Sequence, residues 1–277
     1  GYHGGDSEVF LSEALVAKYP RESYYLADKL PLWHVKEYGD VERLFAEQME
    51  RTKAGYFDFY LLHAVSADAW KRVKETKNDE QLLEKKKQGI IRNLGVSFHG
   101  DLDTFREMLD TRAWDFAQIQ INYLDDVMME AGELHRLLAE KEIPCVVMEP
   151  VRGGFLANLP DEARKIQTAV NADSAAAWAL RWCMNKEDIS LILSGMSTME
   201  QLEENLALFA EERPFTEAER KALEETRDAV LAIKNVPCTA CGYCMDCSFG
   251  VDIPGVFRLY NNYKLFGDAF STKQYYG

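Results

Sequence analysis

The sequence lacks the features of several protein classes. No apolar run approaches the roughly 20 residues that a membrane span needs. The first residues, GYHGGDSE, lack the basic and apolar regions of a signal peptide. Lys and Arg number 32 against 46 Asp and Glu, and they are too dispersed to neutralise nucleic-acid phosphates. We therefore expect a cytoplasmic protein that has neither membrane nor nucleic acid among its partners.

Cysteine is scarce outside one short stretch. Cys145 and Cys183 stand alone in apolar surroundings, where a buried and reduced thiol is the common case. A secreted disulfide framework therefore fits poorly. The other four of the six cysteines lie within residues 238–247, CTACGYCMDC, and need a separate explanation.

Six short β-branched and aromatic runs alternate with longer amphipathic stretches, which predicts repeated βα units and a parallel sheet. The predicted strands are residues 24–30, 57–63, 92–97, 116–122, 145–149 and 191–196. No glycine-rich dinucleotide fingerprint follows any of them, so the pattern favours an α/β fold of the (β/α)8 TIM-barrel type over a doubly wound sheet. A closed barrel needs eight strands. Because GYHGG is typical of the end of a strand-to-helix loop, we expect the first strands to precede Gly1.

The predicted helices suggest how the chain is divided. Asp40 is expected to cap one helix, Asp101 opens another, and the stretch from Trp70 to Gly89 predicts a helix with a break. After Pro214 the alternation stops, and residues 216–234 predict one charged amphipathic helix. The predicted divisions are a barrel over 1–215, a linking helix over 216–236 and a small helical, cysteine-rich extension over 237–277.

Three polar residues lie where a barrel of this type places its chemistry, near the carboxyl ends of strands. Tyr2 precedes the first helix, Lys29 ends the first predicted strand and His63 ends the second. A tyrosine can protonate a carbonyl oxygen if a nearby ammonium lowers its pKa, and a histidine can orient that oxygen. Taken singly, such a histidine is more often structural and such a lysine usually reaches solvent.

Five segments, GYHGGDSE, ADKLP, DFYLLH, LGVSFHG and LSGMSTMEQLEENL, occur in an order that resembles the aldo/keto reductases. The resemblance covers residues 1–210 and implies NAD(P)H-dependent reduction of a small-molecule aldehyde or ketone. It implies that Tyr2, Lys29 and His63 are three members of a catalytic tetrad whose aspartate would precede Gly1. Asp28 is no substitute, because adjacent strand residues point to opposite faces.

The same resemblance implies a set of cofactor contacts. Ser97 and Gln118 would hold the nicotinamide carboxamide, with Phe98 where relatives usually have asparagine and Met148 where many stack an aromatic ring. The residues matching the adenosine-end contacts are Ser197, Gln201, Glu204 and Asn205.

Two features of the expected cofactor site leave alternatives open. Many relatives have lysine and arginine where this chain has Gly195 and Gln201, so the sequence does not decide between NADP and NAD. The loop PVRGG contains Arg152 and Gly153, which could contact the pyrophosphate or simply form a turn after a strand.

The cysteine run resembles the bacterial ferredoxin pattern C-x2-C-x2-C-x3-C-P more than zinc sites, which usually come as two separated pairs. It departs from that pattern in having two residues before its last cysteine and Ser248 where proline is usual. The expected metal ligands are Cys238, Cys241, Cys244 and Cys247. In such runs the fourth cysteine ligates a second cluster, so Cys238, Cys241 and Cys244 would hold three corners of one cluster, whose fourth ligand is unaccounted for.

A bacterial branch of the aldo/keto reductases carries a C-terminal ferredoxin-like domain with two such runs, and VDIPGVFRLYNNYKLFGD resembles its connecting segment. This resemblance implies a [4Fe–4S] cluster, a second cysteine run beyond Gly277 and an electron-transfer protein as a further candidate partner. Hydride transfer moves two electrons at once, whereas an iron–sulfur cluster moves one at a time. The sequence has no flavin-binding motif for a cofactor that could connect the two.

Two other functions remain open at this point. The barrel could bind a nicotinamide cofactor mainly as a redox sensor or electron-transfer subunit with slow chemistry. A (β/α)8 isomerase or lyase acting on a phosphorylated sugar would bind no nicotinamide at all.

Overall fold

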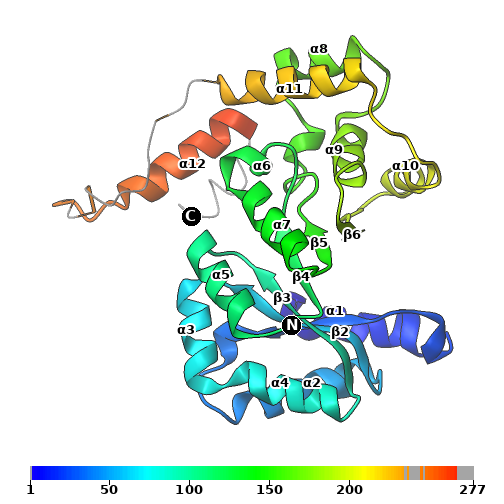
Figure 1. Cartoon of the computed structure of the whole chain (residues 1–277), viewed down its shortest axis with the longest axis vertical. Coiled ribbons are helices and arrows are strands. Elements are labelled where there is room, and N and C mark those ends of the chain that lie inside the picture. The colour runs from blue at the N-terminus through cyan, green and yellow to red at the C-terminus, as the bar shows by residue number, and fades with distance from the viewer. Residues whose placement is uncertain (1, 234–235, 237–243, 246, 267–277) are drawn as a thin grey trace. The chain divides into compact units, whose positions relative to one another are not determined.

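The computed structural model describes residues 2–233, 236, 244–245 and 247–266. It consists of two compact units (Figure 1). The first comprises residues 1–121, 125–148 and 187–193, and the second comprises 122–124, 149–186 and 194–277. No helix in the described part of the chain is long and apolar enough to span a membrane.

A six-stranded sheet forms the centre of the first unit. Its neighbouring strands are parallel and follow one another in chain order. The strands are β1 (Ala27–Pro31), β2 (Phe57–Val65), β3 (Ile91–Phe98), β4 (Phe116–Gln120), β5 (Cys145–Met148) and β6 (Ile189–Ile192). All six predicted strands are present: the starts of β2, β4 and β5 are as predicted, and the other ends are shifted by one to four residues. The order along the sheet is the one that successive βα units produce.

The sheet is stabilised by strands whose side chains are buried on both faces, as is typical of parallel sheets covered by helices. Phe57, Tyr60 and Leu62 of β2 are fully buried. The Phe45 ring of helix α2 (Asp40–Thr52) packs edge-on against Phe57 and Tyr60, with ring centroids 5.7 and 5.1 Å apart. These contacts connect β2 to α2, the helix that follows β1.

Helices connect the strands and contact one another in series. The remaining helices of this unit are α1 (Asp6–Leu11), α3 (Ala67–Thr76), α4 (Asn78–Lys87), α5 (Leu102–Thr111), α6 (Asp125–Met128) and α7 (Ala131–Glu140). In Figure 1, α2 and α4 lie beside each other, and α3 contacts both α4 and α5. Single helical turns cover Tyr2–Gly5, Ser12–Val16, Arg21–Ser23 and Leu32–His34.

Two of the helix predictions can be compared in detail. The predicted break between Trp70 and Gly89 is confirmed: Lys77, with φ of 53°, separates α3 from α4. The expected Asp40 cap is wrong, because Gly39 is the N-cap of α2 and the Asp40 carboxylate instead accepts hydrogen bonds from the N–H groups of Lys36 and Glu37.

Asp101 caps α5 as predicted, and its replacement is a test of local stability. Its carboxylate accepts a 2.9 Å hydrogen bond from the Thr104 N–H, which lowers the pKa of Asp101. We expect Asp101→Ala to lower the free energy of unfolding by about 1 kcal/mol at neutral pH. A carboxyl with a lowered folded-state pKa stabilises above its unfolded-state pKa, so the difference between the two proteins should shrink as the pH falls below 3.8. Urea unfolding at pH 7 and pH 3 measures both effects, and an unchanged midpoint at pH 7 would contradict the cap.

The second unit is mainly helical. It contains the turn Phe155–Ala157 and helices α8 (Asp161–Thr168), α9 (Ala175–Met184), α10 (Met199–Phe209), α11 (Glu217–Leu231) and α12 (Ile253–Phe266). The helix predicted over 216–234 corresponds to α11, which begins with a Thr216–Glu219 capping box. In Figure 1 α11 lies alongside α8, and Leu223 and Val230 of α11 join a buried cluster that includes Trp178 of α9.

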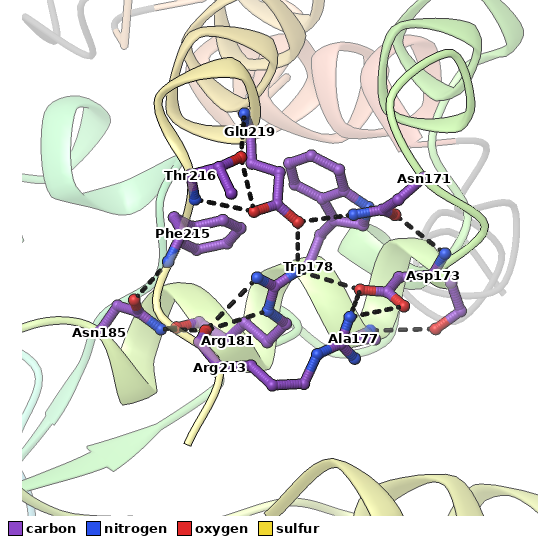
Figure 2. A network of polar contacts seen from close by, with 11 residues as sticks. Asn171, Asp173, Ala177, Trp178, Arg181, Asn185, Arg213, Phe215, Thr216 and Glu219 are labelled. Carbon is purple, nitrogen blue, oxygen red and sulfur yellow. Dashed lines mark hydrogen bonds and ion pairs between the residues drawn. The ribbon is translucent and has the colours of Figure 1, made fainter. Parts of the chain in front are cut away.

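A buried ionic network links α9 and α11 within this unit (Figure 2). The Arg181 guanidinium, 2% exposed, donates hydrogen bonds to Asp173 at 3.0 Å and to Glu219 at 2.8 Å. It also donates to the Arg213 carbonyl oxygen, and it lies 4.4 Å from the centroid of the Phe215 ring. Arginine suits this position because its planar group can serve several acceptors at once.

Candidate active site

The Tyr2 hydroxyl lies within hydrogen-bond distance of both Lys29 and His63. The Tyr2 hydroxyl is 3.0 Å from His63 Nε2, and Lys29 Nζ donates to the same hydroxyl at 3.3 Å. The Tyr2 ring is 53% exposed, so a small molecule can approach the hydroxyl. The structure therefore brings together the three residues that the sequence singled out.

Strand register explains why two of these residues meet. Pro31 of β1 lies opposite His63 of β2, and Lys29 lies two residues earlier in β1. Residues two apart in a strand point to the same face, so Lys29 and His63 share one face of the sheet. Tyr2 reaches them from the helical turn Tyr2–Gly5, which precedes α1.

The electrostatics of the group differ in one respect from the expectation. Burial, followed by the charge of Lys29, lowers the pKa of His63 to about 4, so its imidazole is neutral at physiological pH. Burial also lowers the pKa of Lys29. The sequence suggested that a nearby ammonium would lower the pKa of Tyr2, but burial and the negative charge of Asp28 raise it. Tyr2 is therefore held in its protonated form.

Two neighbours of this group were not anticipated from the sequence. Trp33, just beyond β1, places its ring 4.9 Å from the His63 ring and is 52% exposed. His99 directly follows β3, and its charge contributes to lowering the pKa of His63. His99 carries the signal that singled out His63, a histidine at the carboxyl end of a strand. An exposed tryptophan just past a strand end was the available signal for Trp33.

Ser97, Gln118 and Met148 form a second polar group in the first unit. They lie on β3, β4 and β5, and neighbouring register places Ser97 opposite Gln118. Gln118 Nε2 donates to Ser97 Oγ at 3.3 Å and contacts the Met148 sulfur at 3.1 Å. Ser97 is fully buried and Gln118 is 4% exposed. The Met148 thioether beside them is only a weak hydrogen-bond acceptor. This donor and acceptor set is complementary to a carboxamide.

The residues expected at the adenosine end of the cofactor surround the start of α10 in the second unit. The Gln201 side-chain oxygen accepts from the Ser197 N–H at 2.7 Å and from the Thr198 N–H at 3.3 Å. The bond from the Thr198 N–H forms a capping box with the bond that the Gln201 N–H donates to the Thr198 hydroxyl. Asn205 donates to Ser194 Oγ at 3.0 Å, and Glu204 is exposed. Gln201 and Asn205 thus have a structural role in this region.

The loop PVRGG forms a turn, as one of the two interpretations expected. Gly153 and Gly154 have φ of 63° and 90°, in the left-handed region that glycine adopts without strain. The neighbouring Arg152 also has a positive φ of 52°, and its guanidinium lies 5.7 Å from the centroid of the Phe155 ring.

The four expected metal ligands divide into two pairs. Cys238 and Cys241 lie outside the described residues, whereas Cys244 and Cys247 are described and have free thiols. The N–H groups of Val251 and Phe249 hydrogen-bond to the Cys247 thiol and lower its pKa. Within the ranges that the structure describes, no group of three or more His, Cys, Asp or Glu side chains could hold a metal ion.

A family model decides the identity of the chain. The model of the aldo/keto reductase family matches residues 1–228. The chain belongs to the aldo/keto reductase family. It is accordingly an NAD(P)-dependent oxidoreductase, and the isomerase or lyase interpretation is wrong.

Two curated relatives of this aldo/keto reductase have named activities. NADH-specific methylglyoxal reductase of Escherichia coli (strain K12) is 27% identical over 252 residues, covering 75% of this chain and 76% of the relative. L-galactose dehydrogenase of Arabidopsis thaliana is 26% identical over 259 residues, covering 85% and 79%.

Solved structures show the same fold as this aldo/keto reductase. The holo form of an aldo-keto reductase from Bacillus halodurans superposes with a TM-score of 0.68 at 22% identity, covering 81% of this chain and 79% of that one. An aldo-keto reductase from Klebsiella pneumoniae in complex with NADPH gives 0.64 at 18% identity, covering 81% and 76%. The six parallel strands thus match structures of the (β/α)8 barrel type.

Proposed function

We propose that this aldo/keto reductase reduces an aldehyde or ketone, with Tyr2 as proton donor, Lys29 as its charged neighbour and His63 orienting the carbonyl oxygen. The observation that carries the proposal is the position of the Tyr2 hydroxyl, within hydrogen-bond reach of both His63 Nε2 and Lys29 Nζ. A positioned acid and an orienting donor are what carbonyl reduction requires of the protein.

The roles of the three residues follow from their protonation states. A nicotinamide cofactor, when bound, supplies a hydride, the two electrons that reduce the carbonyl carbon. Tyr2, whose pKa is raised, keeps its proton until negative charge develops on the substrate oxygen and then transfers it there. The neutral imidazole of His63 can donate from Nε2 to that oxygen. Lys29 Nζ donates to the Tyr2 hydroxyl, so it can stabilise the phenolate that the transfer leaves behind.

The cofactor assignment rests on two groups of residues. The hydroxyl and amide of Ser97 and Gln118 suit the nicotinamide carboxamide. Residues 194–206, SGMSTMEQLEENL, contain three glutamates and no lysine or arginine, so they offer no cation to a 2′-phosphate. We therefore favour NADH over NADPH, with Ser197, Gln201, Glu204 and Asn205 at the adenosine end and Arg152 and Gly153 near the pyrophosphate. The NADH specificity named for the Escherichia coli relative supports this choice.

Steady-state turnover of a panel of small aldehydes and ketones tests the proposal, with NADH and NADPH compared at equal concentrations. We expect turnover that depends on the carbonyl, and a higher kcat/KM for NADH. Tight binding of the nicotinamide cofactor without turnover of any carbonyl would instead support the redox sensor or electron-transfer subunit. Higher kcat/KM with NADPH would contradict the cofactor assignment alone.

We further propose that the cysteine run supplies iron–sulfur ligands within a ferredoxin-like extension over 237–277, with Cys238, Cys241 and Cys244 on one [4Fe–4S] cluster and Cys247 on a second. The supporting observation is the hydrogen bonding of the Cys247 thiol by two backbone N–H groups, which lowers its pKa. The thiolate is the form that ligates iron, and N–H groups bonded to the sulfur tune iron–sulfur centres. An electron-transfer protein is then a fitting partner.

Anaerobic purification followed by iron, sulfide and zinc analysis and visible absorption tests the cluster. We expect Cys247→Ser to lower the iron content at least about twofold, because one ligand is lost. Cys183→Ser is the matched control, since this thiol is buried in α9 and should leave the iron content unchanged. Stoichiometric zinc without sulfide, or an iron-free wild-type protein, would contradict the proposal.

A further inference from the structure

The regular pairing of β2 with β3 is interrupted at His63. Leu62 of β2 lies opposite Val96 of β3. Val65, three residues further along β2, lies opposite Phe98, which is only two residues further along β3. Strand β2 therefore carries one extra residue between these pairs, which makes a β-bulge. A bulge bends its strand and re-aims the side chains within it, and His63 is one of them.

The residue that follows His63 has an unusual backbone conformation. Ala64 has a φ of 55°, in the left-handed region. Among the residues that the structure describes, it is the only non-glycine residue inside a strand that has a positive φ. A left-handed conformation costs an L-residue energy, and it persists only where the surrounding structure requires it. The two sides of the bulge show what requires it here.

On the N-terminal side of Ala64, the pairing of β1 with β2 places His63 on the same face of the sheet as Lys29. His63 Nε2 lies there 3.0 Å from the Tyr2 hydroxyl. The centroid of the His63 ring lies 5.3 Å from that of Tyr2 and 4.9 Å from that of Trp33. These contacts require His63 to point toward the candidate active site.

On the C-terminal side of the bulge, Val65 points to the opposite face. It is fully buried and lies opposite Phe98 of β3. The Phe98 ring packs against Phe105 of α5, with ring centroids 4.5 Å apart, so Val65 lies on the helix-facing side of the sheet. Residues two apart in a regular strand share a face. His63 and Val65 can therefore point to opposite faces only because Ala64 adds one residue between them.

We propose that Ala64 is a positioning residue: its left-handed conformation forms the bulge that directs His63 toward the Tyr2 hydroxyl while Val65 stays buried. If residue 64 became extended, the regular alternation would return and would put His63 and Val65 on one face. Val65 would keep its place, because burial of an apolar side chain stabilises more than a hydrogen bond at a partly exposed site. His63 would then turn away from Tyr2. The inference rests on the proposed function only for its effect on turnover, since the direction of the His63 ring is a property of the protein alone.

The first test compares valine with glycine at position 64. Valine strongly disfavours a positive φ and favours an extended strand, whereas glycine adopts a positive φ freely. Nuclear magnetic resonance of the full chain with labelled aromatic rings should show nuclear Overhauser contacts from His63 to Tyr2 and Trp33, with the His63 signals assigned by their loss in His63→Asn. We expect these contacts to persist in Ala64→Gly and to disappear in Ala64→Val. Their persistence in Ala64→Val would overturn the proposal.

The second test measures turnover in the same variants. Ala64→Val should lower kcat for carbonyl reduction at least about tenfold, because a misplaced group loses much of its catalytic effect. Ala64→Gly should keep kcat within about twofold of wild type, since glycine retains the left-handed conformation. Loss of the ring contacts in Ala64→Val without loss of kcat would refute the role of His63 in the proposed function and still support the positioning by Ala64.

Lys77→Val is the matched control for backbone strain. Lys77 also has a positive φ, of 53°, but it lies between α3 and α4. Valine at this position should lower the urea midpoint and leave both kcat and the His63 ring contacts unchanged. An equal loss of kcat in Lys77→Val and Ala64→Val would indicate a general effect of strain and overturn the proposal.

A second pair of variants serves if Ala64→Val fails to fold. Asparagine and threonine are both polar and of moderate size, but asparagine adopts the left-handed conformation far more readily, and threonine is β-branched. Ala64→Asn should keep the ring contacts and the turnover, and Ala64→Thr should lose both. Equal contacts and equal turnover in these two variants, or the reverse order, would overturn the proposal.

Discussion

Replacement of Tyr2 by phenylalanine is expected to lower kcat for carbonyl reduction at least about 100-fold, the lower range for losing a positioned acid. The change removes one hydroxyl, which lies 3.0 Å from His63 Nε2 and 3.3 Å from Lys29 Nζ. The interaction is needed mainly as charge develops on the substrate oxygen, so cofactor affinity should change little. Steady-state kinetics and a fluorescence titration with NADH measure the two quantities separately.

The matched control is Tyr38→Phe, since Tyr38 is 64% exposed and takes no part in the Tyr2 group. It should retain wild-type turnover. Unchanged turnover in Tyr2→Phe would place the proton donor elsewhere, whereas a parallel loss of cofactor affinity and turnover would indicate a collapsed site.

Replacement of Arg181 by methionine is expected to lower the free energy of unfolding by about 3–5 kcal/mol, the usual result of removing one partner from a buried ion pair. The substitution removes the cation that the Asp173 and Glu219 carboxylates share, and it leaves Asn185 as the remaining side-chain donor to the Arg213 carbonyl oxygen in this network. Urea unfolding followed by tryptophan fluorescence measures the change, because Trp178 belongs to the same region.

The pH dependence provides a second signature of this network. Arg181 is the main cause that lowers the pKa of Glu219 to about 2. Glu219 therefore contributes stability above its ordinary pKa of 4.5, and this contribution is lost as the pH falls from 4.5 toward 2. The deficit of Arg181→Met should shrink over the same interval. Arg164→Met, with an exposed arginine on α8, should change stability by less than about 0.5 kcal/mol, and an equal effect of both variants would contradict the network's importance.

Much of the sheet could be predicted because its strands carry the signal in local composition. The runs FDFYLLH and CVVME are short, apolar and bounded by polar segments, so both their existence and their parallel order followed from the alternation with helices. Strand ends and helix caps were harder to predict. The Asp40 cap failed because two N–H groups on its N-terminal side, those of Lys36 and Glu37, donate to the Asp40 carboxylate, a competition that spacing alone does not reveal.

The candidate site was predictable in its residues but not in its electrostatics. Lys29 and His63 could be selected from their places near strand ends, and Tyr2 from its place before the first helix. That the pKa of Tyr2 is raised depends on burial and on Asp28, whose own surroundings come from α1, α2 and β2. The sequence does not show which charged residues will lie near Tyr2, because those residues come from separate elements that only folding brings together.

The alternation of Asp28 and Lys29 in β1 has a consequence for insertions and deletions. Pairing of β1 with β2 places Lys29 on the face of His63 and Asp28 on the opposite face. Adding or deleting one residue within β1 would exchange the two faces and bring a carboxylate to the place of the Lys29 ammonium. The same change in the loop before the strand would leave this alternation intact. Length variation should therefore be tolerated before Ala27 and excluded between Ala27 and Pro31 in any working version of this enzyme.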